Sequence, residues 1–166
     1  TGLHILPGVI DSQVHFREPG MEYKADLETE ARSAALGGVV AVFEMPNTNP
    51  ATTTPAALQD KLKRAAGRMD VDHAFYAGAT HENVDLLPEM ERMLGCCGVK
   101  VFMGASTGDL LIADDEGVEA VLGGRIPAKV DAHNNAVDGR VRPPQPRHLR
   151  ERLRGRFRAA RPVHTH

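Results

Sequence analysis

The sequence predicts an α/β protein built as a partial TIM-type (β/α) barrel, with about the first five to six strands present. Two observations predict this fold class. From residue 8 to about residue 124, short apolar segments alternate with helical segments, the pattern of βαβ units around a parallel sheet. Several apolar segments also end in polar residues, and the functional groups of barrel enzymes gather at the C-terminal ends of their strands.

The first turn argues against the main alternative, a doubly wound nucleotide-binding sheet. Such a sheet needs a glycine-rich turn after its first strand. Here the turn reads Phe16-Arg17-Glu18-Pro19-Gly20, without G-x-G-x-x-G, so a barrel is preferred. Because a typical barrel takes about 250 residues, we expect this chain not to close one. An open sheet edge invites pairing with another chain, so a homo-oligomer is one expectation.

The elements follow in a regular order. Strands are expected at 8–15, 39–43, 74–78 and 98–103, and helices at 24–36, 54–66, 83–94 and 115–122. Gly37 and Gly38 provide a C-terminal stop for the first helix. Thr54 and Pro55 provide an N-cap and a first helical residue for the second. A fifth strand is expected at 126–133, and residues 161–166 would begin a sixth.

Composition limits the class of protein. The chain of 166 residues is 42% apolar and 25% charged, which is ordinary for one globular domain. No apolar run approaches the roughly 20 residues that span a bilayer, and no signal peptide is visible. Cys96 and Cys97, the only cysteines, are adjacent and do not form a disulfide framework. We therefore expect a cytoplasmic protein without membrane partners. Its first residue, Thr1, suggests that sequence upstream is missing.

Three segments carry candidate chemistry. The first strand ends in Asp11-Ser12-Gln13-Val14-His15-Phe16-Arg17, where alternation places Gln13 and His15 on one face. Taken alone, such a histidine could equally be a satisfied core residue. The second segment is Met45-Pro46-Asn47-Thr48-Asn49-Pro50, and the third is Gly98-Val99-Lys100-Val101-Phe102-Met103-Gly104-Ala105-Ser106-Thr107-Gly108.

Together these segments resemble one enzyme family. The first resembles the D-x-H-x-H-x-R signature of cyclic amidohydrolases, which are metal-dependent barrel hydrolases. The second resembles the M-P-N-T loop of dihydroorotases, and the third resembles their fourth-strand segment. Hydantoinases and allantoinases would share the first motif but not the full M-P-N-T-N-P loop. The resemblance covers about residues 5–124, and we divide the chain into amidohydrolase-like βα units (1–138) and an arginine-rich segment (139–166).

The resemblance implies roles for individual residues. Arg17 and Asn47 match the residues that hold the substrate carboxylate, and the planar guanidinium of arginine suits that ligand. Lys100 matches a catalytic position that is carboxylated in many relatives and bridges two metal ions. An ordinary lysine whose stem is buried and whose head reaches water is the alternative for Lys100.

The resemblance also implies zinc, as one or two ions. Its ligands would be Gln13, His15, carboxylated Lys100, His133 at the end of the fifth strand and His166, which we prefer to His164. Gln13 stands where the family has the first histidine of its metal pair, and imidazole suits zinc better than an amide oxygen. Asn134 and Asn135 also replace an acidic pair that usually follows the fifth-strand ligand.

The implied activity is the interconversion of dihydroorotate and carbamoyl aspartate in pyrimidine biosynthesis, with dihydroorotate as the small-molecule partner. The family's general-base aspartate lies on an eighth strand that we do not find in this sequence. Together with Gln13, this leaves a second hypothesis from another class: a catalytically inactive, dihydroorotase-like structural or assembly protein.

The arginine-rich segment differs in charge from the rest of the chain. Residues 1–138 hold 11 lysines and arginines against 21 acids, whereas residues 139–166 hold nine arginines and one acid, Glu151. It could be a phosphate-binding arm, a disordered segment, or sequence foreign to the family through a shifted reading frame. The third hypothesis explains best why the resemblance fades near residue 125, and nucleic-acid binding is disfavoured.

Overall fold

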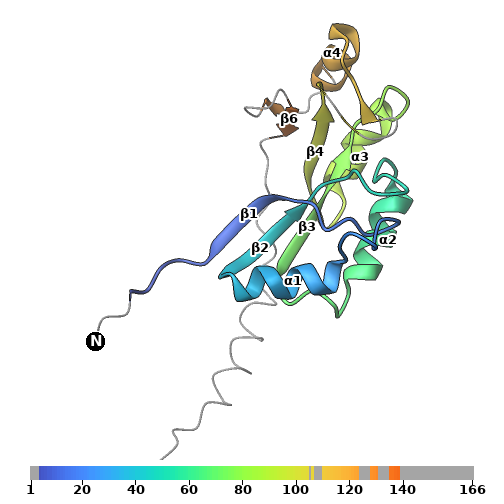
Figure 1. Ribbon diagram of the computed structural model, residues 1–166. Helices are drawn as coiled ribbons and strands as arrows, with labels where there is room; N and C mark the ends of the chain where they lie inside the picture. Colours follow the sequence, from blue (N-terminus) through green and yellow to red (C-terminus); the bar gives the residue numbers. More distant parts are fainter. Residues whose placement is uncertain (1–3, 105, 107–109, 124–127, 131–134, 139–166) are drawn as a thin grey trace, which may run out of the picture.

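The computed structural model describes residues 4–104, 106, 110–123, 128–130 and 135–138, and these form one sheet with helices against it (Figure 1). The sheet has the strand order β1-β2-β3-β4-β6-β5. Its first four strands are parallel: β1 (Val9–Val14), β2 (Val39–Glu44), β3 (Asp72–Gly78) and β4 (Cys96–Phe102). Four consecutive parallel strands joined by helices confirm the predicted partial barrel.

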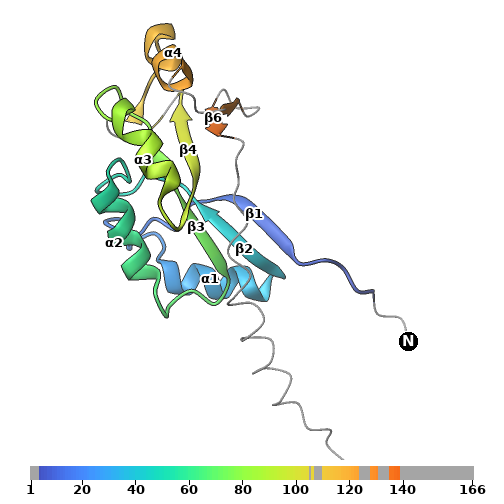
Figure 2. The same ribbon diagram turned by 180° about the vertical axis from the view of Figure 1, so that it is seen from behind.

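The helices between these strands lie on one side of the sheet (Figures 1 and 2). They are α1 (Leu27–Leu36), α2 (Pro55–Ala65) and α3 (Leu87–Arg92), the last preceded by the 3₁₀ helix η1 (Val84–Leu86). A further helix, α4 (Asp115–Gly123), follows β4. None of the helices in the described parts of the chain is long and apolar enough to cross a membrane.

The helix ends follow from local sequence. Asp26 caps α1 by accepting hydrogen bonds from the backbone N–H groups of Glu28 and Thr29. Thr54 caps α2 through its hydroxyl, and Pro55 occupies the first turn, where its missing N–H costs nothing. Such caps contribute about 1 kcal/mol each.

The two faces of the sheet carry different apolar clusters. The larger cluster joins Val42, Phe75 and Val99 of the strands to Leu58 of α2 and Met90 of α3. The smaller cluster lies on the other face, which would be the barrel interior. Its members are Phe43, Met45, Ala74, Tyr76 and Cys97. Alternate residues of β2 and β3 therefore serve the two faces, and both strands are buried on both sides.

Strand β4 contains an irregularity next to the predicted chemistry. Phe75 of β3 pairs with Cys96 of β4, and the next residue of β3, Tyr76, pairs with Gly98. Strand β4 therefore has one extra residue at this point. Gly98 has φ 151°, which favours glycine. Such a bulge changes which side chains share a face. Val99 belongs to the helix-side cluster, and Lys100 therefore points to the interior side.

Two expectations about the elements are wrong. The third helix does not run continuously over 83–94, because Pro88 restricts the residue before it and is tolerated only in the first turn of a helix. The fifth strand, expected to be parallel to the others, is described at β5 (Ala128–Val130); it pairs antiparallel with β6 (Asn135–Asp138), which itself pairs antiparallel with β4. Only a few residues separate β5 from β6, whereas a parallel connection needs about a dozen or more.

Candidate functional site

The loops that follow β1 and β2 meet at the C-terminal edge of the sheet. The backbone N–H of Asn49 donates to the carbonyl of Pro19 at 2.9 Å, and that of Met45 donates to the carbonyl of Val14 at 3.0 Å. At Gly20, φ is 84° and a Cβ atom would lie only 1.9 Å from the backbone oxygen of Asn49. The absence of a side chain at Gly20 is therefore what lets the two loops touch.

His15 follows β1 directly and is half-buried. Its Nδ1 atom is buried and has no hydrogen-bond partner. Burial, and then the charge of Arg17, hold the pKa of His15 below its ordinary value; Lys100 and Lys61 act in the same direction. The neutral imidazole that results is the form that binds a metal ion.

Asn47 lies on the neighbouring loop close to His15. Its side chain acts against the other groups on the imidazole, favouring the charged form of His15. The Oδ1 atom of Asn47 is buried without a hydrogen-bond partner. A buried carbonyl oxygen and a buried ring nitrogen that both lack partners are costly unless a ligand satisfies them.

Arg17 has an unusual backbone conformation. Its φ of 66° makes it the one described non-glycine residue at positive φ. An L-residue in this region costs roughly 1–2 kcal/mol, and such strain persists where the surroundings fix it, often at functional sites. The strained residue is the arginine that the sequence assigns to the substrate carboxylate.

Lys100 lies near the end of β4 and is 1% exposed. Its Nζ atom lies 5.2 Å from the centroid of the Phe102 ring. With Arg17 and Lys61, the last of which is paired with Glu44, it lowers the pKa of His15. The structure therefore brings His15, Arg17, Asn47 and Lys100 to one edge of the sheet.

The described residues offer few ligands to the metal ion that the resemblance implies. They contain no group of three His, Cys, Asp or Glu side chains that could hold an ion. His15 fits a ligand, because its buried ring nitrogen is unsatisfied. The side chain of Gln13 is exposed, and its backbone N–H donates to Asp11 at 3.0 Å. His133, His164 and His166 lie outside the described residues.

A separate cavity of about 610 Å³ opens among the same loops. Thr48, Thr53, Thr80 and Asn83 contribute to its lining, but His15, Arg17, Asn47 and Lys100 do not. It is therefore not the site predicted from the motifs.

Sequence reasoning missed a buried ion pair beneath the loops. Glu44, the last residue of β2, and Lys61 of α2 are each 1% exposed, and Lys61 Nζ donates to Glu44 Oε2. Burial raises the pKa of Glu44 and lowers that of Lys61, while their attraction opposes both shifts. The available signal was a lysine three residues after Leu58 and four before Ala65, on the buried face of α2.

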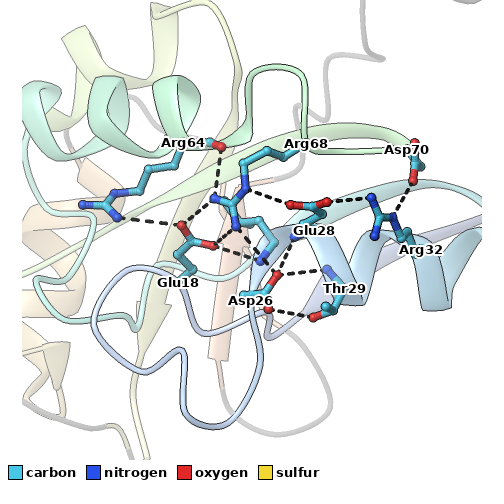
Figure 3. A network of polar contacts seen from close by, with 9 residues as sticks. Glu18, Asp26, Glu28, Thr29, Arg32, Arg64, Arg68 and Asp70 are labelled. Atoms are coloured by element: carbon cyan, nitrogen blue, oxygen red, sulfur yellow. Dashed lines mark hydrogen bonds and ion pairs between the residues drawn. The ribbon is translucent and has the colours of Figure 1, made fainter.

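A second ionic cluster holds the β1–α1 loop from its other end (Figure 3). Glu18 is buried and accepts hydrogen bonds from Arg68 at 2.7 and 3.0 Å and from the Leu27 N–H at 3.1 Å. Arg64 approaches the same carboxylate at 3.7 Å. Burial acts to raise the pKa of Glu18, but these hydrogen bonds and charges outweigh it and hold the pKa below its ordinary value.

Parallel βα units with polar groups gathered at the C-terminal edge of the sheet are typical of the class of (β/α)-barrel enzymes. The L-hydantoinase (dihydropyrimidinase) from Arthrobacter aurescens shares the fold, with a TM-score of 0.61 and 32% identity over 69% of this chain and 26% of that one. A family model described as Dihydro-orotase-like matches residues 2–86, about half of the chain, and the chain belongs to this family.

Individual relatives agree with this assignment. The chain is 42% identical over 118 residues to a dihydroorotase of Halobacterium salinarum, covering 71% of this chain and 26% of the relative. For a dihydroorotase of Methanosarcina mazei the identity is 39% over 116 residues, covering 70% and 25%. An allantoinase of Escherichia coli is 37% identical over 116 residues, covering 69% and 25%. The chain thus spans about a quarter of the length of these relatives.

Proposed function

We propose that residues 8–104 form the carboxylate-binding part, and one portion of the metal-binding part, of a dihydroorotase-type hydrolase. The substrate would be dihydroorotate, whose ring amide is opened to give carbamoyl aspartate in pyrimidine biosynthesis. One observation carries the proposal: the positive charges of Arg17 and Lys100 both act on His15, at the edge where Asn47 also lies, and this supports an anionic ligand.

In this proposal the loop residues bind and orient the substrate. The Arg17 guanidinium would pair with the substrate carboxylate in a fork-to-fork arrangement, which fixes direction as well as distance. The buried amide of Asn47 would hydrogen-bond to the same ligand and satisfy its unpartnered oxygen or donate through its nitrogen. Such fixation places the ring carbonyl for attack.

Zinc, as one or two ions, is part of the proposal. The described chain would contribute His15 and Lys100, the latter once carboxylated, and we propose His133 and His166 as further ligands, with Gln13 as the weakest. Bound zinc would supply a polarised carbonyl and a water of lowered pKa. A carboxylated Lys100 would also replace one of the positive charges that act on His15 with a negative one.

A second candidate function is supported by Gln13. Its side chain is exposed at the position where the family has a histidine. A family member without that ligand could serve as an inactive structural or assembly partner. We propose this role as the alternative.

Binding measurements distinguish a substrate that carries a carboxylate from an uncharged cyclic amide. Calorimetry with the chain should show affinity for dihydroorotate and carbamoyl aspartate and much weaker affinity for uncharged hydantoin. Arg17→Gln should weaken dihydroorotate binding about tenfold or more, since a hydrogen bond to a charged group contributes about 1.5–3 kcal/mol. Arg32→Gln is the matched control, because Arg32 is an exposed arginine that pairs with Glu28 on α1. Equal affinity for hydantoin and dihydroorotate would refute the proposed substrate.

Measurements of turnover distinguish the proposed enzyme from the alternative role as an inactive structural or assembly partner. We expect no measurable hydrolysis of dihydroorotate by residues 1–166 alone at saturating zinc, with Lys100→Ala as the control. A chimera in which residues 8–104 replace the matching segment of the Halobacterium salinarum dihydroorotase supplies the remaining elements. Turnover by this chimera, increased by Gln13→His, supports the enzyme. If both chimeras are inactive although they bind zinc and dihydroorotate, the alternative role is the better one.

A further inference from the structure

One side chain of α2 links the two loops that carry Arg17 and Asn47. Lys61 Nζ donates to the Glu44 carboxylate and, at 3.0 Å, to the backbone carbonyl of Met45. Met45 begins the loop that leads to Asn47. Lys61 is thereby fixed at the start of the β2–α2 loop.

The partner of Lys61 reaches the other loop. The backbone amides of Arg17 and Phe16 act on the Glu44 carboxylate and favour its charged form. Glu44 is otherwise enclosed, with 1% of its side chain exposed. The same two strand ends are joined by the N–H of Met45, which donates to the carbonyl of Val14 at 3.0 Å. The interactions thus run from α2 through Lys61 and Glu44 to the end of β1 and the loop that follows it.

This support lies where the backbone needs it. Arg17 has φ 66°, a conformation that persists only when its surroundings determine it. The amides that favour the charged form of Glu44 belong to Arg17 and to the residue before it. The next residue, Glu18, is held by Arg68 at 2.7 and 3.0 Å. Residues 16–18 are therefore fixed on both sides of the strained position.

We infer that Glu44 and Lys61 are positioning residues, which hold the β1–α1 and β2–α2 loops so that Arg17 and Asn47 meet one ligand. The inference rests on the proposed function in taking Arg17 and Asn47 as substrate-binding residues. A purely stabilising role explains the pair less well. Apolar side chains of similar volume often stabilise a fold as well as a buried ion pair does, whereas they cannot accept hydrogen bonds from a loop.

A matched pair of double variants tests the inference in the 166-residue chain. Lys61→Met with Glu44→Gln removes both charges but keeps an oxygen that can accept from the amides. Lys61→Met with Glu44→Leu removes the charges and the acceptor. Lys63→Met, a change at an exposed lysine of the same helix, is the control.

Amide hydrogen exchange is the first measurement. The amides of Phe16 and Arg17 should exchange about tenfold or more faster in the Leu pair than in the Gln pair, because local opening reports the lost contacts. The amides of Phe75 and Val99, in the core strands, should be unchanged between the two. Equal exchange at Phe16 and Arg17 in both pairs, or an equal increase in the core strands, would overturn the inference.

Ligand binding is the second measurement. Dihydroorotate should bind about tenfold more weakly to the Leu pair than to the Gln pair, since misplacement of a binding group by about 1 Å is costly. If the unmodified chain does not bind dihydroorotate, the proposed function fails. The exchange rates then still decide whether Glu44 and Lys61 position the loop.

Discussion

Gly20→Ala should separate the two substrate loops and destabilise the protein more than any glycine change that affects conformation alone. At Gly20, φ is 84° and the new Cβ would lie 1.9 Å from the backbone oxygen of Asn49. Gly38 has a similar φ of 87°, but a Cβ there would meet nothing within 4 Å. The pair therefore separates the cost of the backbone conformation from the cost of the clash.

The magnitudes follow from these two contributions. A side chain at positive φ costs roughly 1–2 kcal/mol, which both variants share. The clash at Gly20 is with backbone rather than with a flexible side chain, and overpacking of this kind costs about 1–3 kcal/mol more. We expect Gly38→Ala to lower the free energy of unfolding by about 1–2 kcal/mol and Gly20→Ala by about 2–5 kcal/mol.

Urea unfolding followed by circular dichroism measures both values under the same conditions. Hydrogen exchange at the Asn49 amide, which donates to Pro19, should also increase in Gly20→Ala alone. Equal losses of stability in the two variants would show that the loop at Gly20 does not meet the backbone of Asn49.

Three further predictions concern acid stability and metal binding. Because folding lowers the pKa of Glu18, the ionised carboxylate stabilises the protein above its ordinary pKa of 4.5, and this stabilisation is lost as pH falls through the pKa of the folded state. Glu18→Gln should therefore make the free energy of unfolding depend less on pH below about pH 4.5. An unchanged dependence on pH would contradict the role of Glu18. Gln13→His should raise zinc affinity about tenfold or more, measured by competition with a chelator, and equal affinities would contradict the assignment of Gln13. Lys100→Ala should abolish any bicarbonate-dependent uptake of a second zinc ion. A zinc-loaded crystal in which Lys100 is not carboxylated would exclude Lys100 as the bridge between two zinc ions.

The sequence alone determined the parallel βα order and most element boundaries. The continuous apolar run at 39–43, the Thr54-Pro55 start and the Gly37-Gly38 stop are local signals, and each lies within a few residues of the observed boundary. Such signals act through backbone conformation and burial pattern, which neighbouring residues set. The motif residues Arg17, Asn47 and Lys100 could likewise be assigned to one edge, because parallel strands end together.

The tertiary structure decided what holds those residues in place. Glu44 and Lys61 are 17 positions apart, and Glu18 and Arg68 are 50 apart. Neither pairing follows from periodicity, because a charge on a buried face shows only that a partner is needed and not which residue supplies it. The positive φ of Arg17 also lies in a loop whose partners are distant in the sequence, Glu44 at the end of β2 and Arg68 after α2. The sequence thus specified the βα units and the candidate functional residues. Contacts between residues far apart in the sequence, which no local pattern indicates, fixed the geometry of the loops that carry those residues.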